Sequence, residues 1–402
     1  MQIRHLLPVL LGLGSAGALV ATEPASLNEA LAQGQVSLNA RLRHESVAQT
    51  GLRDAAALTL RTRLGYTTAS FHGWKVMLEA ENITAADGDS YSQAGLNPGG
   101  AGKAVIADPE TTELNQAWLA CTVDKSMLAV GRQRLVFDTA RFIGDVGWRQ
   151  NMQTFDAVMV QDKSLDQTVL TYAYVDQVNR VFGHEHAQGK WESDSHLFNA
   201  VYTGYAAGTL TGYAYLLDFA NSAANSCATY GVSFAGKRPV GETLKFAYRV
   251  EYARQSDHAP SALNYSADYY VLEAGLNAKT SGLTLGYEVL GSGRNVGFKT
   301  PLATLHAFNG WADLFLATPA AGLRDIYMKA SATLPGEVSL LAFYHQFAAA
   351  RGGAGFGEEF DVQLARKFAQ RFTATAKYAD FRRDSPAFPN VRKLWLQLDF
   401  AH

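Results

Sequence analysis

Apolar and polar residues alternate in a series of short segments that runs from Val36 to Phe400. In the first segment, Val36 and Leu38 alternate with Ser37 and Asn39. Further segments of this kind occupy residues 58–67, 244–252, 360–367 and 393–400. Because successive side chains of a β-strand point to opposite faces, each segment predicts a strand with one apolar face and one polar face.

The connectors between the predicted strands are alternately short and long. Short connectors rich in Gly, Pro, Asp and Ser lie at 71–73, 124–126, 164–166, 206–208, 239–241, 279–282, 335–337 and 369–370. The largest long connectors lie at 85–112, 134–153, 180–195 and 295–322. Tight turns at one end and long loops at the other are typical of an all-β fold, the transmembrane antiparallel up-and-down β-barrel. We predict a closed barrel of about eighteen strands, or sixteen if one weak pair is miscounted, with both termini periplasmic.

A soluble β-sandwich would show a similar alternation, with its apolar face turned inward. The placement of the aromatic residues distinguishes the two folds. Tyr and Phe cluster toward the ends of the predicted strands, as they do in the aromatic girdles at the two membrane interfaces. This placement favours the barrel.

The beginning of the chain has the layout of a secretory signal peptide, with Arg4 ahead of an apolar stretch at 6–20. We predict a signal peptide at 1–21, a periplasmic N-terminal stub at 22–34 and an outer-membrane β-barrel at 35–402. No later stretch has the roughly 20 continuous apolar residues of a spanning helix. The expected location is the cell outer membrane of a Gram-negative bacterium, in contact with outer-membrane lipid and lipopolysaccharide. Phe400, although followed by Ala401 and His402, is the terminal aromatic that the outer-membrane assembly machinery is expected to read.

The composition narrows the possible partners. The chain has 402 residues, of which 48% are hydrophobic, and a formal net charge of -2, which argues against nucleic acid as a partner. Cys121 and Cys227 lie in separate predicted strands, and we expect two isolated apolar thiols. The sequence His184-Glu185-His186 lies in a polar loop without a paired ligand cluster, so we expect no metal and no cofactor.

A barrel of this size leaves room for an aqueous lumen. On the predicted alternation, cations and anions on the inner face are nearly balanced in number. Closure of the first strand against the last gathers several of the cations into one row, which we call the basic stripe. The basic stripe consists of Arg41, Arg43, Arg61, Arg63, Lys367, Lys377 and Lys393. Such a row attracts anions, because the low-dielectric wall focuses its field into the pore; the alternative is that these charges form an ordinary solvated lumen face.

The connector at 134–153 is a second candidate for a functional element. It is rich in Arg, Asp and Gly, yet it also contains apolar residues such as Phe142 and Trp148. An exposed loop has little use for large apolar side chains, whereas a loop folded into the lumen packs them against the inner wall. We therefore predict that this loop narrows the pore, with Arg141, Asp145 and Arg149 near the constriction.

The segments around this connector resemble a known family. Gly131-Arg132-Gln133-Arg134 and Phe155-Asp156-Ala157 are similar to the alginate export family of outer-membrane porin-like proteins. The resemblance covers essentially the whole mature chain, and it implies a barrel of about eighteen strands whose lumen passes polar or anionic solutes. Arg132 and Arg134 share strand parity with Leu128 and Val130, which are expected to face lipid. Either a bulge resets the register or these arginines lie above the membrane.

The predicted function is a passive outer-membrane porin for small hydrophilic solutes, with at best a modest preference for anionic ones. The alternative is an export channel for an anionic polysaccharide such as alginate, which the nearly balanced lumen charge disfavours. A membrane-embedded hydrolase is less expected, since His345 lies on the lumenal face without a nucleophile motif. A structural barrel with a blocked lumen is a further alternative. We expect no enzymatic activity.

Overall fold

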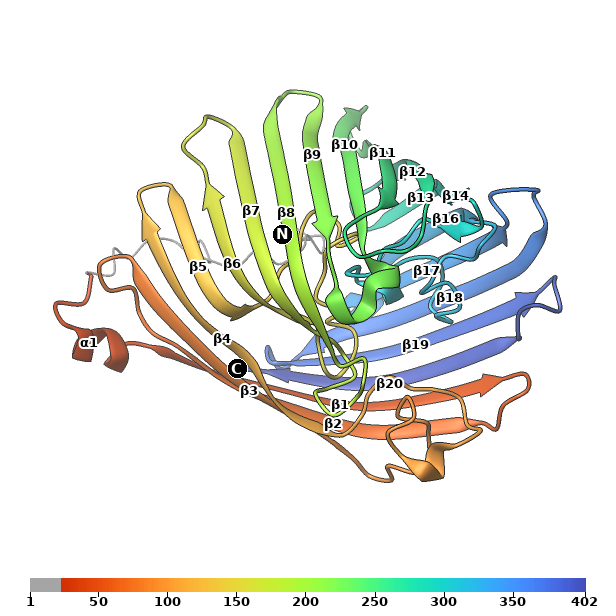
Figure 1. Ribbon diagram of the computed structural model, residues 1–402, viewed down its shortest axis with the longest axis horizontal. Coiled ribbons are helices and arrows are strands. Elements are labelled where there is room, and N and C mark those ends of the chain that lie inside the picture. The colour runs from red at the N-terminus through yellow and green to blue at the C-terminus, as the bar shows by residue number, and fades with distance from the viewer. Residues whose placement is uncertain (1–22) are drawn as a thin grey trace.

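In the computed structural model, which describes residues 23–402, eighteen antiparallel strands form one closed barrel (Figure 1). The strands are β1 (Gln35–Gln49), β2 (Ala55–Thr67), β3 (Trp74–Ala85), β4 (Thr111–Val123), β5 (Ser126–Gln133), β6 (Thr154–Asp162), β7 (Thr168–Asn179), β8 (Lys190–Tyr205), β9 (Gly208–Leu217), β10 (Cys227–Val240), β11 (Leu244–Asp257), β12 (Ser266–Asn277), β13 (Ser281–Leu290), β16 (Leu323–Leu334), β17 (Val338–Ala348), β18 (Gly355–Phe368), β19 (Phe372–Arg383) and β20 (Val391–Ala401). Each strand pairs with the next along the chain, and β1 pairs with β20 to close the barrel. The prediction of eighteen strands is confirmed, and the alternative of sixteen is wrong.

The remaining elements are small. They are the helix α1 (Leu27–Ala32), the 3-10 turns η1 (Pro98–Gly100), η2 (Ala220–Asn225), η3 (Leu305–Ala307) and η4 (Pro335–Glu337), and a two-stranded ribbon of β14 (Ser292–Gly293) and β15 (Val296–Gly297). Within residues 23–402, no helix is long and apolar enough to cross a membrane. The predicted signal peptide at 1–21 lies outside the described residues.

Short and long connectors fall at opposite ends of the barrel. The turns after β2, β4, β6, β8, β10, β12, β16 and β18 lie at the end where β1 begins, and we call this the short-turn end. The chain also finishes there, because the His402 amide donates to the Leu38 carbonyl at 2.9 Å. Both ends of the barrel domain therefore lie at the short-turn end, and its periplasmic location remains a prediction.

The predicted alternation is visible in the burial of each strand. In β2, Leu58, Leu60 and Leu64 are exposed on the outer face, whereas Thr59 and Arg61 are buried on the inner face. A lipid-facing barrel requires this arrangement, because apolar side chains meet the acyl chains and polar ones meet the lumen. The inner face is thus built from the polar positions of each segment.

Exposed aromatic residues lie near both ends of the strands. Trp74, Tyr205 and Phe368 are exposed near the short-turn end, and Tyr230 and Tyr252 are exposed toward the opposite end. Their positions agree with the aromatic girdles expected from the sequence.

The predicted N-terminal stub contains a helix that the alternation did not indicate. Ser26 is the N-cap of α1, and its side chain accepts a hydrogen bond from the Glu29 amide at 3.2 Å. The Glu29 carboxylate in turn accepts from the Ala25 amide at 2.7 Å. These two reciprocal bonds define the start of a six-residue helix.

Candidate functional site

Two long loops enter the lumen from the end opposite the short turns. The first lumenal loop (134–153) joins β5 to β6, and the second lumenal loop (291–322) joins β13 to β16. They contact each other inside the barrel, where the Gly144 amide donates to the Leu302 carbonyl at 2.8 Å. Phe142 of the first loop packs on the inner wall, with its ring centre 5.3 Å from that of Tyr213 and 5.2 Å from that of Tyr269. The large apolar side chains of this loop are therefore explained by wall contacts.

Arg149, at the tip of the first lumenal loop, is held by three carboxylates from three different segments. Its guanidinium lies 3.1 Å from Glu45 Oε2 on β1, 2.9 Å from Asp313 Oδ2 on the second loop and 3.8 Å from Asp108 Oδ2. Burial alone would lower the pKa of Arg149, but the carboxylates outweigh it and raise the pKa above its ordinary value. The guanidinium therefore carries a permanent charge that ties both loops to the wall. Lys393 of β20 adds a fourth link, with Nζ 2.7 Å from Asp313 Oδ2.

Trp148 lies beside this centre between aromatic and cationic groups. Its ring stacks on His306 of the second loop, with centres 4.6 Å apart and planes 4° apart. Arg43 Cζ lies 4.1 Å from the Trp148 ring centre and Lys377 Nζ lies 4.2 Å from it. Cations over an indole face are attracted by the ring quadrupole, most strongly where water is excluded. Trp148 therefore contacts two side chains of the basic stripe through its ring.

His306 connects the aromatic stack to the carboxylate centre. Its Nδ1 lies 2.7 Å from Asp313 Oδ1, and its Nε2 lies 2.6 Å from Lys377 Nζ. Burial, together with the charge of Lys377, outweighs Asp313 and lowers the pKa of His306 well below its ordinary value. The neutral ring can therefore donate to Asp313 and accept from Lys377 at the same time.

Arg141 anchors the other side of the first lumenal loop. Its Nε donates to Glu288 Oε1 of β13 at 2.8 Å, and its Nη2 donates to Asn309 Oδ1 at 3.0 Å. The predicted constriction residue Asp145 pairs with Arg134 Nε at 2.9 Å within the same loop. The three predicted constriction residues, Arg141, Asp145 and Arg149, are all buried. Arg141 and Arg149 bind the loop to other segments, and Asp145 forms an ion pair within the loop.

The basic stripe is divided by the lumenal loops. Arg43, Arg61, Lys377 and Lys393 are buried. Arg43, Lys377 and Lys393 contact residues of the lumenal loops, whereas Arg61 donates to Asn39 Oδ1 of the neighbouring strand β1. Arg41 Nε pairs with Asp399 at 2.8 Å, and its Nη1 donates to the Trp148 carbonyl at 3.0 Å. Arg63 pairs with Glu81, and Lys367 is exposed close to the short-turn end. Asp399 and Glu81 lie directly opposite Arg41 and Arg63 on adjacent strands, as strand parity and barrel closure predict. Asp108 beside Arg43 and Asp313 beside Lys393 come from long loops, and strand parity does not reveal these two partners.

The segments that carried the family resemblance have structural roles. Gly131 has φ 118°, and a Cβ at this position would lie 2.3 Å from the Ala117 carbonyl oxygen, so only glycine fits. Arg132 holds Asp156 in a bidentate ion pair at 2.7 and 2.8 Å. Its Nη1 also donates to the Leu114 carbonyl at 3.0 Å, on a part of β4 that the short strand β5 does not reach. Arg132 thus connects β4 with β6 beyond the end of the short strand β5.

The register question raised by the sequence is resolved here. Arg132 keeps the outward parity of Val130, and β5 ends at Gln133, so Arg134 already belongs to the first lumenal loop. Gln133, Phe155 and Ala157 are buried, and Gln133 Nε2 donates to the Ala157 carbonyl at 3.0 Å. No bulge within β5 is needed.

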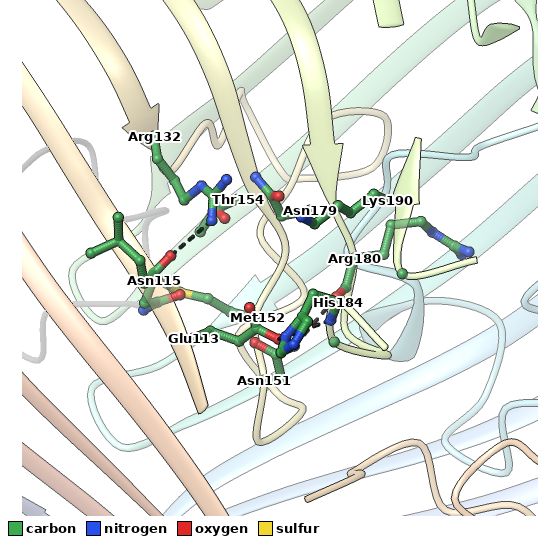
Figure 2. Close-up of a pocket in the computed structure, with 13 residues that line it drawn as sticks. Glu113, Asn115, Arg132, Asn151, Met152, Thr154, Asn179, Arg180, His184 and Lys190 are labelled. Atoms are coloured by element: carbon green, nitrogen blue, oxygen red, sulfur yellow. Dashed lines mark hydrogen bonds and ion pairs between the residues drawn. The ribbon is translucent and has the colours of Figure 1, made fainter. Parts of the chain in front are cut away.

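Figure 2 shows the crevice between Arg132 and the loop that joins β7 to β8. It is lined by polar side chains including Asn151, Asn179 and His184, and its volume is about 10 Å³, which is room for about one water molecule. His184 Nδ1 lies 2.8 Å from Glu113 Oε1. Among residues 23–402, no group of three or more His, Cys, Asp or Glu side chains is placed to hold a metal ion.

A much larger cavity, the vestibule, opens between the long loops. It has a volume of about 620 Å³ and reaches from Phe182 and Trp191 to Arg149, His306 and Asp313, a size that suits small molecules. Its lining cations Arg180 and Lys299 form no ion pair within the described part of the chain.

These two cations contact backbone carbonyls and aromatic rings instead of carboxylates: Arg180 donates to the Gln188 carbonyl and Lys299 to the Ala224 carbonyl. Arg180 Cζ lies 4.0 Å from the Trp191 ring centre, and Lys299 Nζ lies 5.2 Å from that of Tyr265. Burial lowers the pKa of Arg180 to about 10, so this guanidinium remains charged near neutral pH. Burial also lowers the pKa of Lys299. Neither residue belongs to a strand pattern or a motif, so no signal in the sequence points to them.

His345, the inward histidine that raised the hydrolase alternative, contacts carboxylates. Its Nδ1 lies 2.9 Å from Asp325 Oδ1, and its Nε2 lies 3.9 Å from Asp361 Oδ2. Both ring nitrogens of His345 face acids, and among residues 23–402 no hydrogen bond joins His345 to a Ser, Thr or Cys nucleophile. Cys121 and Cys227 are free thiols, as expected.

A closed eighteen-strand barrel with an apolar outer face and a loop-filled polar lumen defines an outer-membrane β-barrel of the porin class. The family model for alginate export matches residues 32–282, and the chain belongs to this family. This family is named for export.

Solved structures show the same fold at low sequence identity. Pseudomonas aeruginosa OccK9 (OpdG) superimposes with a TM-score of 0.71 and 16% identity, over 93% of this chain and 100% of that one. Acinetobacter baumannii OccAB3 superimposes with a TM-score of 0.72 and 14% identity, over 92% of this chain and 99% of that one. Pseudomonas aeruginosa OpdK with vanillate superimposes with a TM-score of 0.69 and 14% identity, over 92% of this chain and 98% of that one. No relative was found among the curated proteins.

Proposed function

We propose that this protein is a passive outer-membrane channel for small hydrophilic solutes with a preference for anions. The observation that carries the proposal is the vestibule, whose cations Arg180 and Lys299 lack carboxylate partners in the described residues. Arg149 also lines it, and Asp313 is the one carboxylate that lines it within residues 23–402. Unpaired cations in a cavity with low-dielectric walls raise the local concentration of anions.

The route through the lumen supports the same preference. Below the lumenal loops, Arg41 and Arg63 of the basic stripe remain partly exposed. Because each has a carboxylate beside it, the field there is weaker than in the vestibule. The proposed selection for anions therefore occurs mainly at the vestibule, and diffusion down the concentration gradient accounts for transport. The structure of OpdK with vanillate makes an aromatic carboxylate a suitable first solute to test.

The test is the reversal potential of single channels in a planar bilayer under a salt gradient. We expect a modest anion preference in the natural protein and a shift toward cations in Arg180→Gln combined with Lys299→Gln. Arg254→Gln is the matched control, since Arg254 lies on the outer face of β11 in an exposed pair with Asp268. An unchanged reversal potential in the vestibule variant would refute the assignment.

Export of an anionic polysaccharide is a second candidate, because the matching family model is that of alginate export. Addition of alginate oligomers to the same bilayer separates the two proposals. Block of the current by oligomers, with strong anion selectivity, favours export; ohmic current that the oligomers leave unchanged favours the small-solute channel. A current-free barrel would favour the structural alternative.

The proposed setting of the channel follows the sequence predictions. The short-turn end, with the stub and both ends of the barrel domain, faces the periplasm, and the long loops face the cell exterior. Lipopolysaccharide and the outer-membrane assembly machinery are the proposed partners. Cleavage of the long loops by an added protease in intact cells would support this orientation, and resistance of every loop would contradict it.

A further inference from the structure

Helix α1 lies beside the short-turn ends of the first strands (Figure 1). It is attached to the turn between β2 and β3, where the Ala69 amide donates to the Ala30 carbonyl at 3.1 Å. The Tyr66 hydroxyl donates to the Leu31 carbonyl. Tyr66 shares strand parity with Leu60 and Leu64, which are exposed on the outer face. The helix is therefore held at the rim on the lipid side of the wall.

The helix has one apolar face and one polar face. Leu27 and Leu31 are one helical turn apart and are 60% and 46% exposed, while Ala30, the next apolar position around the helix, is buried. Asn28, Glu29 and Gln33 occupy the other side. Gln33 Nε2 donates to Glu29 Oε1 at 2.8 Å, and this bond keeps the polar side chains together. An amphipathic helix of this kind binds at a membrane interface with its apolar face in the acyl chains.

The apolar face of α1 is continuous with the outer face of the barrel. Val36, at the start of β1, is 62% exposed, and Leu64 of the paired strand β2 is 57% exposed. Trp74, an interfacial aromatic residue, begins the next strand and is 46% exposed. Leu27 and Leu31 thus extend an existing lipid-facing surface at the depth of an aromatic girdle.

We propose that α1 is an interfacial anchor whose residues Leu27 and Leu31 insert into the phospholipid leaflet at the short-turn end of the barrel. The partner is lipid rather than a protein, because the exposed leucines continue the lipid-facing surface and the polar face of the helix turns away from it. The anchor fixes the depth of this rim in the membrane and holds the entry to β1 against the wall. It is independent of which solute the channel carries.

Site-directed spin labelling tests the insertion. Cys121→Ser and Cys227→Ala remove the natural thiols, and single cysteines at 27, 31, 28 and 33 receive a nitroxide. A label at 60, on the exposed lipid-facing side of β2, serves as the membrane reference. Each folded barrel is reconstituted in vesicles of phosphatidylethanolamine and phosphatidylglycerol. Power saturation then compares accessibility to oxygen, which enters lipid, with accessibility to a water-soluble nickel chelate.

We expect the labels at 27 and 31 to behave like the label at 60, with high oxygen and low nickel accessibility. The labels at 28 and 33 are expected to show the reverse. Nickel accessibility at 27 and 31 equal to that at 28 and 33 would overturn the proposal, and so would protection of 27 and 31 that needs an added protein extract. A change in migration on denaturing gels after heating verifies that each labelled barrel was folded before heating. The accessibility measurement does not depend on transport by the channel.

Discussion

Replacement of Arg149 by methionine removes the charge that joins both lumenal loops to β1. Glu45, Asp108 and Asp313 surround its guanidinium within 3.8 Å. Among the described residues, Glu45 would lose its one ion-pair partner, whereas Asp313 keeps Lys393 and Asp108 keeps Arg43. Breaking a buried ion pair by removing one partner costs ~3–5 kcal/mol. The strand ladders do not pass through Arg149, so we expect this cost to appear as release of the loops rather than as unfolding of the barrel.

The size of the effect follows from that cost. A change of ~3 kcal/mol moves a two-state equilibrium by roughly a hundredfold, enough to populate a released state that is rare in the natural protein. We expect Arg149→Met to raise single-channel conductance, or the time that the channel spends in its higher-conductance level. The folded fraction, measured as the fraction of protein whose migration on denaturing gels shifts on heating, is expected to stay unchanged. Arg254→Met is the matched control, since an exposed Arg–Asp pair contributes ~0–1 kcal/mol. Conductance equal to that of the natural protein, in a variant shown to be folded, would refute the role of Arg149.

Three further predictions concern single groups. The pKa of His306 is depressed while the loops are in place, so its protonation favours the released state, and occupancy of that state should rise as pH falls below ~6.5. His306→Gln should flatten this dependence of occupancy on pH. The same pH dependence in both proteins would contradict the role of His306. Burial raises the pKa of Asp138 to about 6, so ionisation weakens the closed loop as pH rises toward 6. Asp138→Asn should retain the contact with Asn199 and slow tryptic cleavage of the loop at pH 8. At pH 4, cleavage by a protease that is active in acid should proceed equally in both proteins. Gly131→Ala should lower the stability of the barrel by ~1–3 kcal/mol and reduce the folded fraction on gels. Gly212→Ala should leave the folded fraction unchanged, because the space around the added Cβ is open. Equal folded fractions of the two variants would show that the positive φ of residue 131 does not require glycine.

The barrel itself could be predicted because its signal is local. The two-residue period of segments such as 36–43 and 393–400 is written in neighbouring residues, and the short turns between segments are written in Gly, Pro and Asp. The strand count follows from these two signals without knowledge of any long-range contact. Helix α1 was missed, because six residues are too few for a helical period to be recognised.

The site depended on contacts that the sequence does not encode locally. The alternation placed the basic stripe on the inner face, and the apolar residues of the first lumenal loop indicated that it folds inward. The partners of Arg149 lie on β1, in the loop that follows β3 and in the second lumenal loop. No local rule relates these positions, so the anchoring of the loops could not be predicted.

What the sequence by itself determined is the alternation of faces, the order of strands and turns, and the family. What only the tertiary structure decided is which charges meet. Closure of the barrel brings β1 beside β20, and the second lumenal loop carries His306 and Asp313 to the first. The physical reason is that a side chain's parity fixes its direction, whereas its charge partner depends on chain segments that approach only after the barrel closes and its loops fold into the lumen.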